Sequence, residues 1–350
     1  MHLNKLGIIG AAKDKLLCGP KSVYIDITTA CNINCNFCWI HSPLLKVKPY
    51  KKHLNLDLRT IKHVIDTAYE WKTEDISLAG DGEPTMHPQI REIIEYVKEK
   101  RIRLYLATNA TFQENLLLSI AKVDHLYVDL CSPDEASYRK FQAPHSKGLH
   151  LKVTKNLKVL AALQKKHGSP FLNIAFIINK TNYTVIPQML NYCDSIGINE
   201  VTFRVIETTP NTEKLALSPT DKKKLKDIIK KTLEKKRRLT HNLNAVNHAL
   251  ENYELSEFNI QSCYTGWFNI LIDFNKNIGL CCHNENLIVG NLKKSSLTDI
   301  WKSKRSHQLR LQCKYAFNLQ QSPFKNECNW CHWNRENLKI QEEIKKIEKR

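Results

Sequence analysis

The chain has 350 residues, and 53 lysine and arginine side chains against 35 aspartate and glutamate side chains give a formal charge of +18. This length suggests about two domains with a real hydrophobic core. A hydrophobic fraction of 42% and a charged fraction of 25% exclude a mainly disordered chain. No apolar run approaches the ~18 residues of a membrane-spanning helix, and residues 6–12 are too short for a signal peptide. We therefore expect a cytoplasmic protein with no membrane partner.

The predicted elements alternate between strand and helix. Apolar and β-branched runs predict six strands, over residues 23–28, 76–79, 102–108, 126–130, 172–178 and 201–206. Helical patterns separate the strands; Asp57 caps the first of them, and Pro88 lies in the first turn of the second. This alternation predicts parallel strands with right-handed crossovers, that is, an α/β fold with a partial (β/α)6 TIM-like barrel. In such barrels the chemistry collects at the carboxyl ends of the strands.

Much of the basic excess lies beyond these strands, in residues 222–238 and 339–350. In the first stretch Leu225, Ile229 and Leu233 recur at helical spacing, so we expect its lysines on the solvated face of an amphipathic helix. Neither stretch interleaves the aromatic side chains that stack on bases. The charge therefore favours an acidic partner without indicating nucleic acid.

Cysteines give the strongest signal for chemistry. Of the 12 in the chain, Cys31, Cys35 and Cys38 fall within eight positions, and six more lie between residues 263 and 331. A secreted disulfide scaffold is normally small and spreads its cysteines through the chain, so ligation of a metal or cluster explains this placement better. Thiolates bind both iron–sulfur clusters and zinc. Three protein ligands on a cubane cluster leave one iron open, and an open position indicates catalysis rather than a structural role.

A glycine-rich turn, Gly-Asp-Gly-Glu-Pro at residues 80–84, follows the second predicted strand. Gly80 and Gly82 allow the backbone to approach a ligand closely, and Glu83 can pair with an ammonium group. On its own such a turn is typical of a plain loop. Its position, one strand after the cysteine loop, makes it informative.

The Cys-x3-Cys-x2-Cys run, with an aromatic residue before its last cysteine, resembles the cluster loop of radical S-adenosylmethionine (SAM) enzymes. The glycine turn is similar to the GGEP motif of that superfamily, with Asp81 where glycine is more usual, and the resemblance spans about residues 23–206. It implies a 4Fe–4S cluster on Cys31, Cys35 and Cys38 that binds SAM and cleaves it reductively. It also implies contacts of the backbone near Phe37 with adenine, and of Gly80, Gly82 and Glu83 with the amino group of SAM.

Further polar residues lie in the predicted strands or at their ends, namely Asn109, Asp129, Ser132, Asn173 and Arg204. They could contact the ribose or carboxylate of SAM, or they could be hydrogen-bonded structural residues. Away from the motifs, Cys18, Cys131 and Cys193 are expected to be small buried hydrophobic residues. Cys131 has a second interpretation, because a thiol at the end of a strand could donate a hydrogen atom to a substrate radical.

The second group of cysteines frames a pattern of its own. Cys263 is followed by a hairpin over residues 267–281, Cys281-Cys282, a Gly-Asn-Leu segment and a short helix, and the pattern ends with Cys328-x2-Cys331. This order resembles the SPASM/twitch extension of a subgroup of radical SAM enzymes. It implies a small C-terminal α+β domain with one auxiliary 4Fe–4S cluster on Cys263, Cys281, Cys328 and Cys331.

Alternatives stay open at this second site. Cys282 could replace Cys281, and Cys313 is a reserve ligand or a free thiol. A zinc site on the same four cysteines is also consistent with the spacing. The expected organisation is an N-terminal extension (1–20), the barrel (21–217), a helical linker (218–255), the cluster domain (256–335) and a basic helix (336–350).

These features predict a radical SAM oxidoreductase or maturase. It would generate a 5′-deoxyadenosyl radical and abstract hydrogen from an unactivated C–H bond, with the auxiliary cluster transferring an electron and flavodoxin or ferredoxin as donor. The substrate would be a small molecule, such as a sugar or aminocyclitol, or a peptide. Since the barrel begins near residue 21, no leader-binding domain fits before it, so a peptide maturase or epimerase would need a separate leader-binding partner. A zinc-stabilised nucleic-acid-binding protein and a non-catalytic cluster carrier are the alternatives from other classes.

Overall fold

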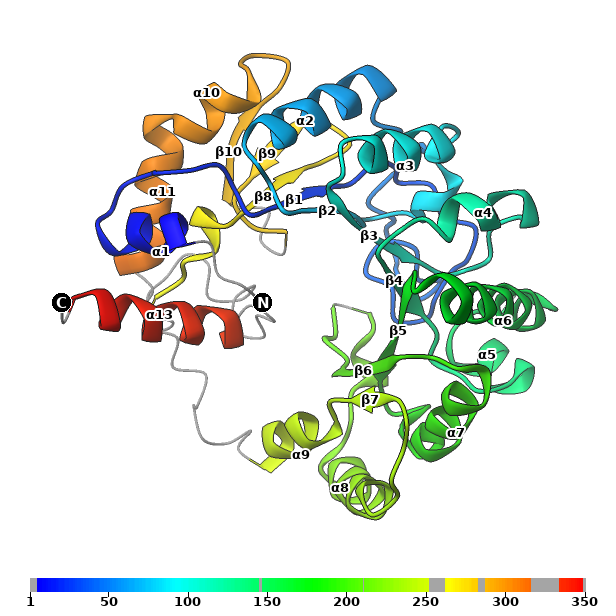
Figure 1. Cartoon of the computed structure of the whole chain (residues 1–350). Helices are drawn as coiled ribbons and strands as arrows, with labels where there is room; N and C mark the ends of the chain where they lie inside the picture. The colour runs from blue at the N-terminus through cyan, green and yellow to red at the C-terminus, as the bar shows by residue number, and fades with distance from the viewer. Residues whose placement is uncertain are drawn as a thin grey trace.

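The structure is a computed structural model that describes residues 5–144, 147–209, 211–251, 262–282, 287–315 and 334–348. Within these residues ten strands form one sheet in the order β10-β9-β8-β1-β2-β3-β4-β5-β6-β7. Figure 1 shows the sheet as an arc with helices along its outer side. The strands are β1 (Ser22–Ile25), β2 (Asp75–Leu78), β3 (Arg103–Thr108), β4 (His125–Asp129), β5 (Phe171–Ile178), β6 (Glu200–Val205), β7 (Thr240–His241), β8 (Asn269–Ile272), β9 (Asn277–Gly279) and β10 (Ile288–Asn291).

The sheet is parallel from β8 through β1 to β7, and only the hairpin strands β9 and β10 pair antiparallel. The six strands predicted from the sequence are β1 to β6, each within a few residues of its expected bounds. Because the described order starts at β10 and ends at β7, the barrel is open. The α/β fold with a partial barrel is therefore confirmed.

The helices cover the outer face of this sheet. They are α2 (Leu58–Glu70), α3 (Ile90–Glu99), α4 (Leu117–Ile120), α5 (Glu135–Phe141), α6 (Leu149–His167) and α7 (Ile186–Ile196). The predicted cap of α2 is confirmed, because the Asp57 side chain accepts the Thr60 N–H at 2.9 Å. Pro88 was wrongly placed in the first turn of α3: the helix begins at Ile90, and Gln89 is its N-cap.

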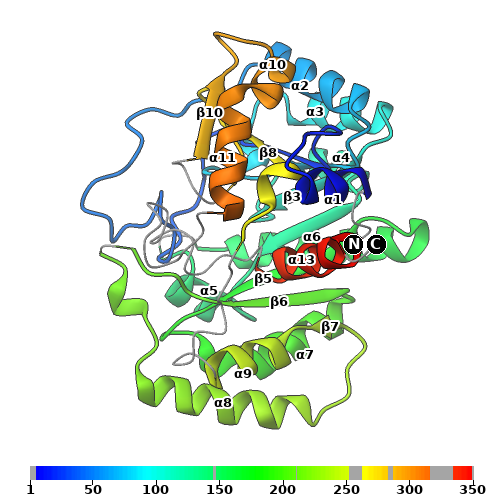
Figure 2. The ribbon, with the colours of Figure 1, turned by 90° about the vertical axis from the view of Figure 1, so that its left-hand side faces the viewer.

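Beyond β6 the chain continues with α8 (Pro219–Leu233), β7 and α9 (Leu243–Glu251). Leu225 and Ile229 of α8 are buried, so the predicted amphipathic helix is confirmed, and its lysines lie away from the core. The stretch expected as a helical linker also contains β7, which pairs with β6 through two residues. Figure 2 shows α8 and α9 on the outside of this end of the sheet.

The C-terminal part continues the barrel sheet. Strand β8 pairs in parallel with β1, so that Ile272 lies opposite Ile25. Helices α10 (Leu297–Lys302) and α11 (Lys304–Tyr315) follow the hairpin. The N-terminal helix α1 (Lys5–Ala12) packs against α13 (Asn334–Glu348), with Ile8 and Ile344 in one buried cluster. No helix in the described part of the chain is both long enough and apolar enough to span a bilayer.

Candidate active site

The cysteine loop starts six residues after β1, at the carboxyl end of the sheet. Cys38 donates its backbone N–H to the carbonyl of Cys35 at 3.1 Å, and Cys38 Sγ accepts the backbone N–H groups of Ile40 (3.4 Å) and His41 (3.2 Å). Burial raises the pKa of the Cys31 thiol to about 12 and the pKa of the Cys35 thiol well above its usual range. Neighbouring cysteines of the loop raise both pKa values further. The structure therefore brings the three predicted ligands together.

Two neighbouring segments clamp this loop. The Asn109 amide donates to Asn32 Oδ1 at 2.9 Å, and Asn32 donates to Thr111 Oγ1 at 2.7 Å, which fixes the Cys31 side of the loop to the end of β3. On the other side, the Asn36 N–H donates to the carbonyl of Gln142, just after α5, at 3.1 Å. Asn32, Thr111 and Gln142 were not predicted as site residues; the three asparagines inside the cysteine loop were the only signal in the sequence.

The glycine turn lies directly against the segment that leads into the loop. Gly80 has φ +144°, and a Cβ there would overlap the carboxyl group of Asp26. A Cβ on Gly82 would lie 2.5 Å from the carbonyl oxygens of both Thr28 and Ala30. Both glycines are thus required for the approach of the two segments, and this packing explains them without any ligand.

Glu83 is buried beside this turn, with 3% of its surface exposed. Its Oε1 accepts the Thr85 N–H at 3.0 Å and the Thr108 hydroxyl at 2.7 Å, while Oε2 accepts the Asn109 N–H at 2.6 Å. Burial raises the pKa of Glu83, and these donors oppose that rise. Among the described residues Oε2 has this one donor only, and a carboxylate oxygen can accept two. Glu83 can therefore still accept a hydrogen bond from a ligand ammonium group.

Two further carboxyl groups border the site. Asp26 follows β1, and burial, followed by the charge of Asp81, raises its pKa to about 8. Asp81 accepts a hydrogen bond from the Tyr50 hydroxyl, and its backbone carbonyl lies 2.9 Å from Nε2 of His41. Asp81 is the residue at which the turn departs from the superfamily motif. Its side chain has its own partner in Tyr50, and its backbone carbonyl contacts His41, just after the cysteine loop.

The other predicted contacts differ in accessibility. Asp129 and Arg204 are exposed at the carboxyl ends of β4 and β6, and Phe37 is half-buried. Ser132 is fully buried, and its hydroxyl has no hydrogen-bond partner among the residues that the structure describes.

Asn109 and Asn173 are already engaged with protein groups. Asn109 Oδ1 accepts the Thr111 N–H at 2.9 Å, in addition to the bond that its amide donates to Asn32. Asn173 donates to Glu200 Oε2 at 2.8 Å and to Thr202 Oγ1 at 3.0 Å. Both residues are buried; Asn109 lies beside the cysteine loop, whereas Asn173 lies near the amino end of β5.

The second cysteine group also converges where the structure describes it. Cys281 and Cys313 belong to one buried cluster, with Cys263 packed against it. The Cys263 N–H donates to the carbonyl of Cys313 at 2.9 Å, which joins the start of this region to α11. Cys282 is half-buried. Cys328 and Cys331 lie outside the described residues.

Comparison with known protein families agrees with this geometry. Residues 25–193 match the radical SAM superfamily, and residues 263–332 match SPASM, an iron–sulfur cluster-binding domain. The chain belongs to the radical SAM superfamily. The first match covers the cysteine loop and the glycine turn, and the second covers the C-terminal cysteine group. The resemblance inferred from the motifs is confirmed, and the family and its enzymatic relatives support the expectation of an enzyme.

Curated relatives match this radical SAM chain over part of its length. The tungsten-containing aldehyde ferredoxin oxidoreductase cofactor-modifying protein of Pyrococcus furiosus is 24% identical over 189 residues, which cover 51% of this chain and 49% of the relative. A probable GTP 3′,8-cyclase of Methanococcus maripaludis is 25% identical over 194 residues, 54% of this chain and 60% of the relative. The chain thus spans about half to three fifths of the length of these relatives.

Solved structures share the fold more completely. Streptococcus suis SuiB bound to S-adenosylmethionine has a TM-score of 0.66 at 16% identity, over 93% of this chain and 76% of SuiB. The protein anSMEcpe with bound AdoMet has a TM-score of 0.62 at 16% identity, over 93% of both chains. These similarities cover the barrel and the C-terminal part together.

The radical SAM domain requires a 4Fe–4S cluster and SAM. The SPASM domain binds auxiliary iron–sulfur clusters. No group of three or more His, Cys, Asp or Glu side chains among the described residues is spaced to hold a single metal ion. The fit of the loop to a cluster therefore rests on its donors: three thiols, two N–H groups directed at Cys38 Sγ, and the remaining acceptor capacity of Glu83. N–H···S bonds are a usual means of tuning such clusters.

Isolated cysteines lie mostly in the core. Cys131 and Cys193 are buried, as predicted, and Cys131 Sγ accepts the Ile177 N–H at 3.2 Å. Cys18 is only half-buried, so the prediction of a core residue was wrong there. It precedes β1 in a connecting segment, where no strand or helix periodicity determines which way a side chain faces.

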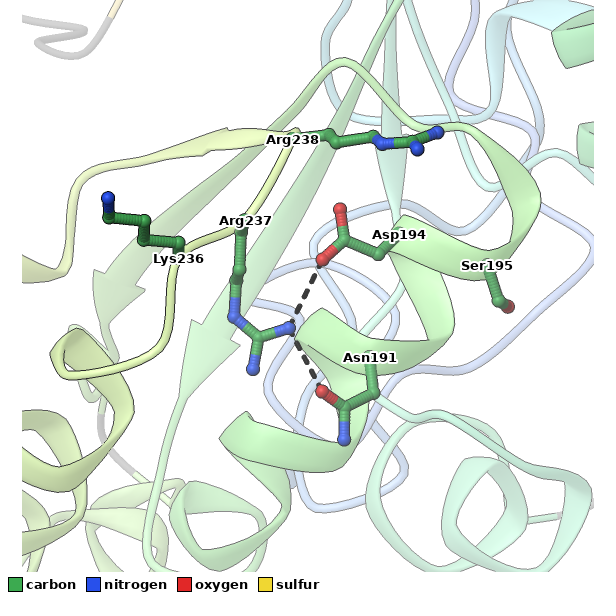
Figure 3. A pocket seen from close by; sticks show the side chains of 6 residues that line it. All are labelled: Asn191, Asp194, Ser195, Lys236, Arg237 and Arg238. Atoms are coloured by element: carbon green, nitrogen blue, oxygen red, sulfur yellow. Dashed lines mark hydrogen bonds and ion pairs between the residues drawn. The ribbon is translucent and has the colours of Figure 1, made fainter.

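A separate hollow of about 580 Å³ lies at the amino ends of the strands, opposite the cysteine loop. Figure 3 shows Arg237 directed toward Asp194 and Asn191, whose oxygens accept from it at 3.2 and 2.9 Å. None of the predicted site residues lines this hollow. Its lining residues are Asn191, Asp194, Ser195, Lys236, Arg237 and Arg238.

Proposed function

We propose that this chain cleaves SAM reductively at the cysteine loop and uses the resulting radical to abstract hydrogen from a substrate C–H bond. When bound, the reduced cluster and SAM supply a 5′-deoxyadenosyl radical. The observation that carries the proposal is the clamped loop of Cys31, Cys35 and Cys38 at the carboxyl end of β1, directly beside the glycine turn and Glu83. This edge of a barrel is where catalytic residues gather.

The residues around the loop bind the cluster and SAM in this proposal. Cys31, Cys35 and Cys38 hold the cluster, and the free acceptor position of Glu83 Oε2 receives the amino group of SAM. The exposed Asp129 and Arg204 face the barrel interior and contact polar groups of SAM. The remaining contacts proposed from the family resemblance are Phe37, Gly80, Gly82, Asn109 and Ser132.

We further propose an auxiliary cluster on Cys263, Cys281, Cys328 and Cys331, which accepts an electron from the substrate radical. Burial supports Cys281 over Cys282. Cys281 packs in one buried cluster with Cys313, and Cys263 packs against that cluster, whereas Cys282 is half-buried.

A peptide is the substrate class that we propose. One of the similar solved structures is SuiB bound to the precursor peptide SuiA, with a TM-score of 0.63 at 17% identity over 87% of this chain. The formal charge of +18 favours an acidic partner, whether substrate or an electron donor such as flavodoxin or ferredoxin. If charge guides the peptide, its binding weakens as salt rises from 50 to 500 mM, whereas binding independent of salt contradicts this step.

The test of the proposed activity is anaerobic reconstitution, followed by iron and sulfide counting and by reduction in the presence of SAM. We expect 5′-deoxyadenosine from the wild type and none from Cys35→Ala. Cys193→Ala is the matched control, because Cys193 is a buried thiol of α7 outside both cysteine groups. Iron-free protein, or equal 5′-deoxyadenosine from wild type and Cys35→Ala, would refute the proposal. Zinc in place of iron at the second site would refute the auxiliary cluster alone.

A further inference from the structure

The hollow at the amino ends of the strands has a lining unlike that of an ordinary ligand pocket. Its volume of about 580 Å³ is typical of a site for a small molecule, but such sites are mostly lined by apolar and aromatic side chains. All six side chains that line this hollow in the described part of the chain are polar or charged. Lys236, Arg237 and Arg238 carry positive charge, and Asp194 carries negative charge. The resulting formal charge of +2 favours an anionic ligand.

The carboxylate of Asp194 is already engaged with protein groups. Its Oδ2 accepts from Arg237 Nη1 at 3.2 Å, and its Oδ1 accepts the Leu239 N–H at 3.3 Å. Asn191 Oδ1 accepts from the same Nη1 at 2.9 Å. These bonds join the segment before β7 to α7 and fix the position of the Arg237 guanidinium. An anion that enters the hollow therefore meets a carboxylate whose charge is largely compensated.

Arg237 is only partly satisfied by these bonds. Its side chain is 6% exposed, and Nε and Nη2 are buried without a hydrogen-bond acceptor among the described residues. A guanidinium has five N–H donors, of which the two on Nη1 account for the bonds to Asp194 and Asn191. Buried donors without an acceptor are unfavourable. The wall of the hollow that Arg237 forms therefore stays positive and has more donors than the described residues satisfy.

The two flanking cations are accessible. Lys236 and Arg238 are exposed, and neither forms a hydrogen bond or an ion pair with a described residue. Figure 3 shows them on either side of Arg237. Residues 222–238, which end at this hollow, contain ten basic and two acidic side chains, so their field attracts anions toward it. Lysine and arginine are the side chains that bind phosphate, lysine as a point charge and arginine as a fork of donors.

We infer that this hollow binds a small molecule through its phosphate groups. Lys236 and Arg238 contact the phosphate oxygens, and Arg237, held by Asp194 and Asn191, forms the fixed positive wall behind them. None of the described lining residues is aromatic, so the bases of a single-stranded nucleic acid would have no side chain to stack on. The site goes beyond the proposed function, because it lies at the opposite ends of the strands from the cysteine loop and uses none of its residues.

The test is isothermal titration calorimetry of the full-length reconstituted protein with pyrophosphate, at an ionic strength of about 0.15 M and without divalent cations. We expect saturable binding at one site. Arg238→Gln and Lys236→Gln should each raise the Kd about tenfold, which corresponds to the loss of one charge-assisted hydrogen bond. Arg237→Gln would also break the ion pair with Asp194, so the test uses the two exposed residues instead. Lys230→Gln is the matched control, because Lys230 is an exposed lysine of α8 in the same basic stretch and does not line the hollow. Its Kd should stay within about twofold of the wild-type value, since screening weakens attraction beyond direct contact.

Wild-type protein that shows no saturable binding of pyrophosphate overturns the inference. Equal weakening in Lys230→Gln and Arg238→Gln also overturns it, because the attraction would then be a general effect of charge and not of the hollow. A short single-stranded RNA serves as the competitor. If the RNA displaces pyrophosphate and binds more tightly than it, with the same dependence on Lys236 and Arg238, the ligand is a nucleic acid and the assignment to a small molecule is wrong.

Discussion

Glu83 offers a direct test of how the site is assembled. Its two oxygens accept backbone N–H groups from both sides, from Thr85 at 3.0 Å on Oε1 and from Asn109 at 2.6 Å on Oε2. In Glu83→Gln the new NH2 group must face one of these two donors, because a backbone N–H cannot reverse its role. One buried hydrogen bond is then lost and two donors oppose each other. We expect a loss of about 2 kcal/mol in the free energy of unfolding, from the range for an unsatisfied buried group.

The assay is urea unfolding of the apo protein, combined with iron content after reconstitution. The Asn109 that Glu83 holds also donates to Asn32 in the cysteine loop, so Glu83→Gln should reduce iron incorporation as well. Glu92→Gln is the control, since Glu92 is half-exposed and pairs with Lys62 at the surface. Its effect should stay below about 0.5 kcal/mol. If Glu83→Gln unfolds at the same urea concentration as the wild type, the carboxylate does not organise the site and the reasoning fails.

Three further predictions concern the same edge of the sheet. Gly82→Ala places a methyl group 2.5 Å from two carbonyl oxygens, and we expect a loss of about 1–3 kcal/mol together with reduced iron content; wild-type iron content would contradict this. The pKa of Asp26 is raised to about 8, so the native state keeps a proton that the unfolded state releases. As the pH rises from about 4 to 8, the free energy of unfolding should therefore fall by up to ~1.4 kcal/mol per pH unit. Urea unfolding of Asp26→Asn should show a flatter profile than the wild type. The pKa of Asp57 is lowered to about 2, mainly by its hydrogen bond with Lys276. The stabilisation that its carboxylate provides is therefore complete above about pH 4 and is lost as the pH falls toward 2. In urea unfolding, Asp57→Ala should lower the free energy of unfolding by about 1 kcal/mol at pH 7 and by less at pH 2.

The barrel and its cysteine loop could be predicted from the sequence because both depend on local patterns. Parallel strands separated by helices bring their carboxyl ends to one edge, so a motif after β1 and a motif after β2 had to be neighbours. Strand β7 could not be predicted, since it has two residues and forms only by pairing with β6. The pairing of β8 with β1 links residues about 250 positions apart, and no local pattern indicates it.

The supporting residues of the site were missed for a similar reason. Asp26 reads as one more polar residue at the end of a strand, yet its carboxyl group occupies the space left by the missing Cβ of Gly80. Gln142 follows a short helix, and only the fold reveals that its side chain bonds both to the Cys131 N–H and to the Asp129 carbonyl. Such contacts join segments whose neighbourhood is decided by the packing of the whole barrel. Motif spacing identifies ligands, whereas the groups that hold them require the structure.

The placement of β8 beside β1 has a consequence for the two cysteine groups. The cysteine loop lies beyond the carboxyl end of β1, whereas β9 runs antiparallel to β8 and leads Cys281 toward the amino end of the same strands. Cys281 lies two residues past the end of β9, so the length of β1 and the residues that lead to the cysteine loop lie between the two groups. The inner face of β1, which carries Tyr24, spans this interval. In the proposed function, a substrate held against that face would lie between the two groups, and an electron from it would reach the second group without crossing the sheet.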